Sequence, residues 1–185
     1  MSKTNKTRKP APVEVTVAQA ILNAVTRAGV DTVFTVTGGP LMPFLRTCKS
    51  ERFPRVVICR HEATAGIMAA AYFHERGVPA ALALTSGPGA ANATNGVIHA
   101  LRETAALFVL SARPASNKLG RGAVQDFDSA RFFAPFTKRS EQLIDPAQLT
   151  FLLDELLAEA TAPAPGPVNL TVCANQWTQS LGVSA

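Results

Sequence analysis

The chain has 185 residues, of which 47% are hydrophobic and 17% are charged, so it is apolar enough to fold as one globular domain and is not a disordered protein. Its net charge of +5 does not indicate nucleic-acid binding, because four bases, Lys3, Lys6, Arg8 and Lys9, lie together in a terminal stretch without any acid. These four leave 14 of the 18 basic residues against 13 acidic ones in the remaining sequence.

We therefore expect residues 1–12 to form a disordered basic tail and residues 13–185 to form a single domain. The tail lacks the apolar core of a signal peptide, and no apolar run approaches the roughly 18 residues that cross a membrane. Cys48, Cys59 and Cys173 form no C-x-x-C pair and are expected to be reduced core thiols. These features predict a cytoplasmic protein with no membrane and no nucleic acid among its partners.

The first predicted element is a helix whose apolar residues recur at helical spacing from Val17 to Ala28, with Thr16 as its N-cap and Gly29 as its end. Short apolar segments then alternate with helical segments along the rest of the chain. The predicted strands span residues 31–36, 55–59, 79–85, 105–112, 135–140 and 167–172, and the further predicted helices span residues 41–45, 62–75, 90–101 and 145–160.

Strands that are apolar throughout and alternate with helices predict a parallel sheet that is covered on both faces. Right-handed crossovers then give an α/β fold, a doubly wound, mostly parallel six-stranded sheet in a three-layer sandwich. Ligands of such folds bind beyond the carboxyl ends of the strands, where the winding direction reverses. Three unusual segments follow strands at that edge: TGGP at 37–40, CRHE at 59–62 and TSGPGAAN at 85–92.

Glu62 stands where a helix is predicted to begin, next to Ala63, Ala65 and Gly66. An acid in the first turn of a helix is commonly present because it stabilises the helix dipole. The neighbours of Glu62, however, are too small and apolar to solvate a carboxylate, which favours the protonated acid. Such a group can donate a hydrogen bond and is suited to acid–base chemistry.

The segment SGPGAAN at 86–92 lacks the third glycine of a dinucleotide-binding fingerprint, and no acid follows at a strand end about 20 positions further on. Pro88 also removes a backbone donor that a phosphate cradle would use. The segment alone predicts a tight turn from a strand into a helix. We therefore do not expect a nucleotide-phosphate site.

The other reactive residue types give weaker signals. His61, His74 and His99 have no ligand-like spacing with acids or cysteines, so no metal site is expected within the chain. Asp126 and Asp128 lie in a Gly-rich loop, and we interpret them as solvated acids or as a helix cap.

Six segments follow one another along the chain: GVDTVFTVTGG, RHEATAG, LTSGPGAANATNGVIHAL, AVQD, TK and PGPVNLTV. Together they resemble the pyrimidine-binding (PYR) domain of thiamine-diphosphate-dependent enzymes, and most of all the acetolactate-synthase-like group. The resemblance covers nearly the whole chain after the tail. It implies thiamine diphosphate as cofactor and a small 2-oxo acid as substrate, which such enzymes decarboxylate or join to a second carbonyl compound.

The resemblance also implies roles for single residues. Glu62 corresponds to the family's catalytic glutamate, which hydrogen-bonds N1′ of the aminopyrimidine and promotes the tautomer that removes the thiazolium C2 proton. Gln125 corresponds to a second catalytic residue, a glutamine that faces the reacting carbon and the substrate. The expected cofactor-binding residues are Gly38, Gly39, Glu62, Pro88 and Asn92.

The sequence departs from the family's pattern at some of these positions. Where acetolactate synthases usually read GYPGG, residues 35–39 read TVTGG, and the family's FQE reads VQD at 124–126. No pair of histidines stands near the front of the loop at 113–128, which argues against an enzyme similar to pyruvate decarboxylase.

Family members hold the diphosphate and Mg²⁺ in a separate pyrophosphate-binding (PP) domain, which carries G-D-G followed later by asparagine. No G-D-G occurs in this sequence. The resemblance therefore implies the PYR subunit of a split enzyme, in an expected heterotetramer whose partner subunit carries the G-D-G motif and holds Mg²⁺. Two alternatives stay open. One is a non-catalytic regulatory or scaffolding relative that retains the fold, and the other, disfavoured by the missing third glycine, is a nucleotide-binding domain.

Overall fold

The computed structural model describes residues 14–49 and 54–183, so the predicted tail at 1–12 lies outside the described part. The strands are β1 (Glu14–Thr16), β2 (Thr32–Thr35), β3 (Arg55–Ile58), β4 (Ala80–Leu84), β5 (Leu107–Arg113), β6 (Arg139–Gln142), β7 (Pro167–Cys173) and β8 (Ser180–Val183). The helices are α1 (Val17–Arg27), α2 (Met42–Thr47), α3 (Glu62–Arg76), α4 (Pro88–Asn92), α5 (Thr94–Arg102), α6 (Ser129–Phe133) and α7 (Leu149–Ala160).

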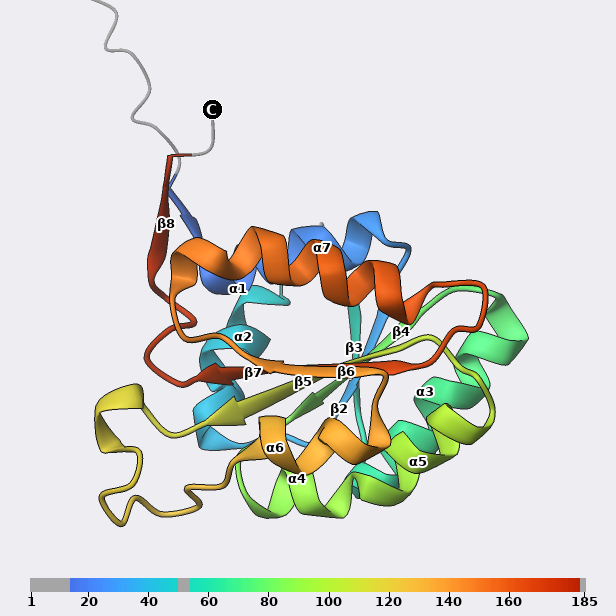
Figure 1. The fold of residues 1–185 in the computed structure, drawn as a ribbon, viewed down its shortest axis with the longest axis horizontal. Coiled ribbons are helices and arrows are strands. Elements are labelled where there is room, and N and C mark those ends of the chain that lie inside the picture. Colours follow the sequence, from blue (N-terminus) through green and yellow to red (C-terminus); the bar gives the residue numbers. More distant parts are fainter. Residues whose placement is uncertain (1–13, 50–53, 184–185) are drawn as a thin grey trace, which may run out of the picture.

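A six-stranded sheet forms the centre of the fold, with the strand order β3-β2-β4-β5-β7-β6 (Figure 1). Every neighbouring pair of strands in this sheet is parallel. The predicted α/β fold, a doubly wound parallel sheet, is therefore confirmed. A separate antiparallel pair joins β1 to β8, and this pair was not predicted.

Helices cover both faces of the sheet, with α1, α2 and α7 on one face and α3, α4, α5 and α6 on the other (Figure 1). For this reason β2, β4, β5 and β7 are buried along their whole length. Successive residues of a strand point to opposite cores, so that Ala81 and Ala83 join one core while Leu82 and Leu84 join the other. Within residues 14–49 and 54–183 no helix is long and apolar enough to cross a membrane.

Local signals in the sequence fix the start of two helices. Thr16 caps α1 as predicted, because its side chain accepts from Gln19 N while the Gln19 side chain accepts from Thr16 N, which is a capping box. His61 caps α3, since its Nδ1 accepts a hydrogen bond of 3.2 Å from Ala63 N. This contact gives His61 a structural role at the point where Glu62 begins the helix.

Besides the pair of β1 and β8, further elements differ from the prediction. The helix predicted at 145–160 begins at Leu149, because Pro146–Gln148 form a 3₁₀ turn. β6 begins at Arg139 and not at residue 135, because Pro135 lies in the 3₁₀ turn Ala134–Phe136 and has no N–H to offer a neighbouring strand. The helix predicted at 90–101 is two helices, since α4 ends at Asn92 and α5 begins at Thr94. α6 was not predicted, because five residues are too few to display a helical period.

α3 and α5 touch through their backbones at a pair of glycines. A Cβ atom at Gly96 would lie 2.6 Å from Gly66 Cα and 2.8 Å from Ala63 O, so no larger residue fits there without movement. α3 begins with Glu62, and α5 directly follows the turn after Asn92. The close approach of these helices therefore sets the distance between those two side chains.

Trp177 connects the C-terminal segment to the turn after β2. Its indole ring is fully buried, lies 5.4 Å from the Phe44 ring between centroids, and donates a hydrogen bond of 3.0 Å from Nε1 to Pro40 O. Pro40 directly follows Gly38 and Gly39. The indole thus supports a turn that the sequence analysis assigned to the cofactor site.

Trp177→Phe removes this hydrogen bond and leaves part of the indole volume empty. We expect the free energy of unfolding, measured by urea denaturation, to fall by about 1–3 kcal/mol. The control is Phe151→Ala on α7, where the aromatic side chain is 64% exposed, and here we expect a change within about 0.5 kcal/mol. Equal losses in the two variants would contradict the supporting role of Trp177.

Candidate active site

The winding of the sheet reverses beside β2, which has β3 on one side and β4 on the other. Parallel strands all end at the same edge, and ligands of doubly wound folds bind there. Gly38 follows β2, Glu62 follows β3, and the turn at 85–89 follows β4. The structure therefore brings these three segments to one place, as predicted from the sequence.

The Glu62 side chain is buried at this edge, since the residue is only 7% exposed. Asn92 at the end of α4 donates a hydrogen bond of 3.2 Å from Nδ2 to Glu62 Oε2. The other carboxyl oxygen faces the turn after β4, because a Cβ at Gly89 would lie 3.5 Å from Glu62 Oε1. Two residues that the sequence analysis assigned to one cofactor are thus in direct contact, although 30 positions separate them.

Thr85 lies between the two glycine turns and was not among the predicted site residues. A Cβ at Gly38 would collide with the Thr85 side chain, and a Cβ at Gly89 would lie 2.7 Å from Thr85 Cγ2. Thr85 Oγ1 is buried and has no hydrogen-bond partner within the described structure. A buried hydroxyl without a partner is costly, so it marks a position where a bound ligand can supply one.

Gln125 lies in the loop between β5 and α6, with a φ of 62° that is unusual for a residue with a side chain. Its backbone packs on Gly87, where an added Cβ would lie 2.9 Å from Gln125 Cβ and 3.3 Å from Gln125 Cα. Gly87 directly precedes the exposed Pro88 at the start of α4. The structure thus brings Gln125 to the turn that carries the predicted cofactor residues.

Gly39 stands apart from this group. No atom lies within 4 Å of the place that its Cβ would occupy. Together with Pro40, Lys118 and Val124 it lines an open hollow between the turn after β2 and the loop after β5. Of the predicted positions, Gly38, Glu62, Pro88, Asn92 and Gln125 belong to the connected group, and Gly39 lies at its margin.

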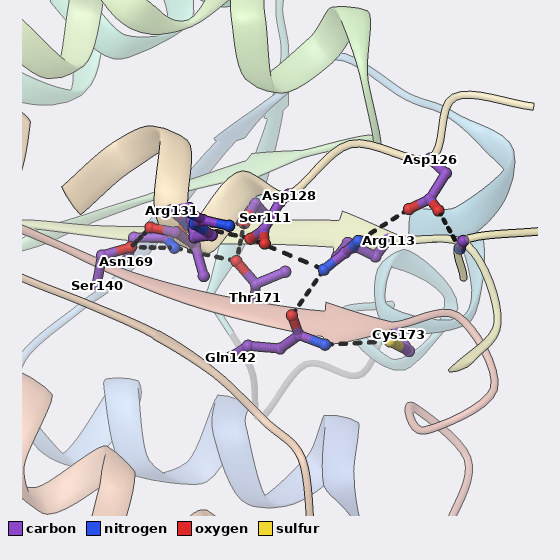
Figure 2. A network of polar contacts seen from close by, with 12 residues as sticks. Ser111, Arg113, Asp126, Asp128, Arg131, Ser140, Gln142, Asn169, Thr171 and Cys173 are labelled. Atoms are coloured by element: carbon purple, nitrogen blue, oxygen red, sulfur yellow. Dashed lines mark hydrogen bonds and ion pairs between the residues drawn. The ribbon is translucent and has the colours of Figure 1, made fainter. Parts of the chain in front are cut away.

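Arg113 anchors the loop that carries Gln125, and this role was not predicted from the sequence. At the end of β5 its guanidinium donates from Nη2 to Asp126 Oδ1 and from Nη1 to Gln142 Oε1, each at 2.8 Å (Figure 2). Asp128 accepts from Arg131 N and caps α6, as one reading of the sequence predicted. The interpretation of Asp126 as a solvated acid is wrong, because it is ion-paired and its side chain is only 17% exposed.

A buried polar network joins β5, β7 and β6 beside this anchor (Figure 2). Ser111 Oγ lies 2.9 Å from Asn169 Oδ1 and 2.8 Å from Thr171 Oγ1, and Asn169 Nδ2 donates to Ser140 Oγ at 2.9 Å. A one-residue shift of β7 would move these groups to the opposite, apolar face. The network therefore fixes the register of the strands that support the loop.

Among the residues that the structure describes, neither the cysteine thiols nor the residues that commonly bind metals form a second reactive site. Burial raises the pKa of the Cys48 thiol to about 12 and raises the pKa of Cys59 and Cys173 as well, so these thiols stay protonated. In the described part of the chain no group of three or more His, Cys, Asp or Glu side chains could hold a metal ion.

The residues at this edge fit a planar heteroaromatic ring of the aminopyrimidine type. Gly38 and Gly89 let the backbones of both turns pack closely against the Thr85 side chain, and Thr85 Oγ1 lacks a partner. The carboxyl group of Glu62 lies beside these two turns and is held by Asn92. Such a ring has both donors and acceptors, which match this hydroxyl and this carboxyl group.

The neighbouring glycines Gly38 and Gly39 provide a matched test of this packing. Gly38→Ala places a methyl group against Thr85, and we expect the free energy of unfolding to fall by about 1–3 kcal/mol. Gly39→Ala meets no atom within 4 Å, and we expect little change. Urea denaturation of both variants is the measurement, and an unaffected Gly38→Ala protein would show that Thr85 does not press on the turn.

The pair of Arg113 and Asp126 predicts a pH dependence. The hydrogen bond from Arg113, followed by that from Gly120 N, holds the pKa of Asp126 below its usual value. A lowered pKa means that the pair stabilises the fold above the ordinary aspartate pKa of about 4, and that this stabilisation is lost as the pH falls through the lowered value.

The stability difference between the wild-type chain and Asp126→Asn should therefore be largest near neutral pH and should shrink below about pH 4. Urea denaturation of both proteins across this range measures it. A difference that stays constant with pH would mean that the charge of Asp126 contributes nothing.

Comparison with known proteins identifies the family. The model of the thiamine pyrophosphate enzyme N-terminal TPP binding domain matches residues 15–132. An acetolactate synthase large subunit of Parasynechococcus marenigrum (strain WH8102) is 30% identical over 165 residues, which are 88% of this chain and 27% of that protein. A sulfoacetaldehyde acetyltransferase of Rhodobacter capsulatus is 29% identical over 163 residues, 85% of this chain and 27% of that protein.

A 2-hydroxyacyl-CoA lyase 2 of Danio rerio is 32% identical over 150 residues, 81% of this chain and 24% of that protein. The chain thus spans about a quarter of the length of these relatives. The region matched by the family model runs from β1 into α6 and contains Glu62, Asn92 and Gln125. On this ground the chain belongs to the thiamine pyrophosphate enzyme family, in which it corresponds to the N-terminal TPP binding domain.

Proposed function

We propose that this chain supplies the pyrimidine-binding half of a thiamine-diphosphate-dependent active site, in a decarboxylase or carboligase that acts on small 2-oxo acids. The observation that carries the proposal is the buried Glu62 carboxyl group, held by Asn92 at the carboxyl edge of the sheet, beside the unpartnered hydroxyl of Thr85. When bound, thiamine diphosphate supplies the nucleophilic carbon for attack on a carbonyl group.

Each residue of the connected group has a proposed task. Glu62 holds or donates the proton at the aminopyrimidine ring, and Asn92 fixes the orientation of its carboxyl group. Thr85 Oγ1, which is buried without a partner, supplies a further hydrogen bond to the cofactor. Gln125, exposed at the tip of its loop, faces the substrate.

The names of the relatives support the class of reaction. The names of an acetolactate synthase, a sulfoacetaldehyde acetyltransferase and a 2-hydroxyacyl-CoA lyase each include a compound with a carbonyl group. A carbon nucleophile from the cofactor suits all three. The proposal for this chain therefore keeps the reaction class and leaves the individual substrates open.

The surface near Glu62 supports a partner. Ile58 at the end of β3 is 59% exposed, and Ile67 and Met68 on the outer side of α3 are 43% and 41% exposed. Exposed apolar side chains of this size are more common at protein interfaces than on free surfaces when they lie together. The proposed partner is a pyrophosphate-binding unit with a G-D-G motif and a later asparagine, which holds the diphosphate and Mg²⁺ in a heterotetramer.

Glu62→Gln keeps the size of the side chain and its hydrogen-bonding capacity but cannot transfer the proton. We expect the rate of cofactor-dependent turnover of a 2-oxo acid by the assembled protein to fall by about 10²–10⁴-fold, with unchanged thermal unfolding. The control is Glu75→Gln, an exposed glutamate on the same helix, which should leave the rate unchanged. Normal turnover by Glu62→Gln would refute the assigned role.

The partner is tested by affinity purification of the tagged chain from its own cells and sequencing of the polypeptide that accompanies it. A polypeptide with G-D-G and a downstream asparagine is the expected result, and the purified assembly should bind thiamine diphosphate only with Mg²⁺. If no assembly binds thiamine diphosphate, the chain is a non-catalytic relative that retains the fold.

A further inference from the structure

The loop between β5 and α6 is tied to the sheet at a buried cation. Arg113 is the last residue of β5 and is 9% exposed, so its guanidinium has a fixed place. A buried charge is tolerated only when it is paired and hydrogen-bonded. Asp126 meets this need at 2.8 Å, and Asp128 lies 3.8 Å away on the other terminal nitrogen.

Asp126 connects three parts of the chain. Its Oδ1 accepts from Arg113 at the sheet edge (Figure 2). Its Oδ2 accepts from Gly120 N, six positions earlier in the same loop, at 2.7 Å. On the other side of Arg113, Gln142 of β6 accepts the second hydrogen bond. The Asp126 carboxylate therefore joins two parts of the loop, Gly120 and Asp126 itself, to Arg113 at the end of β5.

Gln125 directly precedes this carboxylate and has a left-handed backbone conformation. Residues other than glycine keep such a conformation only where the surroundings impose it. Because Gly87 has no side chain, the backbone of Gln125 can pack directly against it. The Arg113–Asp126 pair holds the residue that follows Gln125. Gln125 is thus fixed between a glycine turn and an ion pair.

We infer that the Arg113–Asp126 ion pair is a positioning device that holds the tip of the 114–128 loop against Gly87 and so presents Gln125 to the site. This inference rests on the proposed function, because Gln125 serves a reaction only if the site binds the cofactor. Arg113 and Asp126 act through Gln125 and are positioning residues, which distinguishes their effect from that of Glu62.

The loop itself provides the first test. Lys118 and Arg121 lie within it, so trypsin cleaves there at a rate that reports how often the loop opens. We expect Asp126→Asn in the full chain to raise cleavage at these two positions at least fivefold, measured by mass spectrometry of the peptides. Arg113→Lys should also raise cleavage, because a lysine cannot contact both Asp126 and Gln142 with one rigid fork. The rise should be smaller than in Asp126→Asn, because the lysine keeps the positive charge.

The matched control is Glu155→Gln, which removes the charge from the Arg139–Glu155 contact of 2.9 Å between β6 and α7. It should leave cleavage at Lys118 and Arg121 unchanged. Thermal unfolding should show that every variant is still folded at the temperature of the assay. Unchanged cleavage in Asp126→Asn, or an equal rise in Glu155→Gln, would overturn the inference.

The second test asks whether Asp126 acts through Gln125. In the active assembly we expect Asp126→Asn to lower kcat at least tenfold with little change in KM, and Gln125→Ala to lower it further. The double variant should be no slower than Gln125→Ala alone, because the ion pair has no further task once the side chain that it positions is gone. Additive losses would show that Asp126 acts independently of Gln125 and would overturn the positioning role.

Failure of the proposed function gives a different pattern. If no assembly binds thiamine diphosphate, the positioning of Gln125 for catalysis falls with the proposed function. Faster cleavage of Asp126→Asn would still establish the ion pair as the element that holds the loop, because that measurement requires neither cofactor nor partner.

Discussion

The site depends on the burial of one carboxyl group, that of Glu62. A carboxyl group withdrawn from water needs hydrogen-bond partners, and here Asn92 supplies one from a helix that follows a different strand. That partner is within reach only because α3 and α5 approach each other at Gly66 and Gly96. Gly66 and Gly96, four positions after Glu62 and Asn92, therefore help to determine the geometry at the start of α3.

A second buried charge organises the other side of the site. Arg113 ends β5 and must be paired, and its partners come from the loop and from the edge strand β6. The buried polar side chains of β5, β7 and β6 fix the register of these strands, so the guanidinium and the loop keep a constant relation to the sheet (Figure 2). Polar groups thus order the part of the fold where the sheet meets its longest loop.

Glu62 and Gln125 are held in place by different kinds of interaction. Around Glu62 the backbone is held by helix packing and by glycine turns, so that little can move without a steric collision. Around Gln125 the position depends on a single ion pair between the loop and the sheet, which opens more easily than packed helices separate. Such a division suits a site in which the cofactor stays bound while substrates enter and leave, as the proposed function requires.

The sequence by itself determined the fold class, most of the strands and the position of Glu62, because apolar periodicity, caps and turn residues act over short distances along the chain. It also identified the family, since the motifs that carry the resemblance are local. The partners of individual side chains were decided only by the tertiary structure. The pairing of Arg113 with Asp126 and the contact of Gly87 with Gln125 each join segments whose separation in the sequence carries no periodic signal. Likewise, only the folded structure reveals that the Thr85 hydroxyl is buried without a partner. Packing and the burial of charge bring such groups together, and both depend on where the strands meet in space.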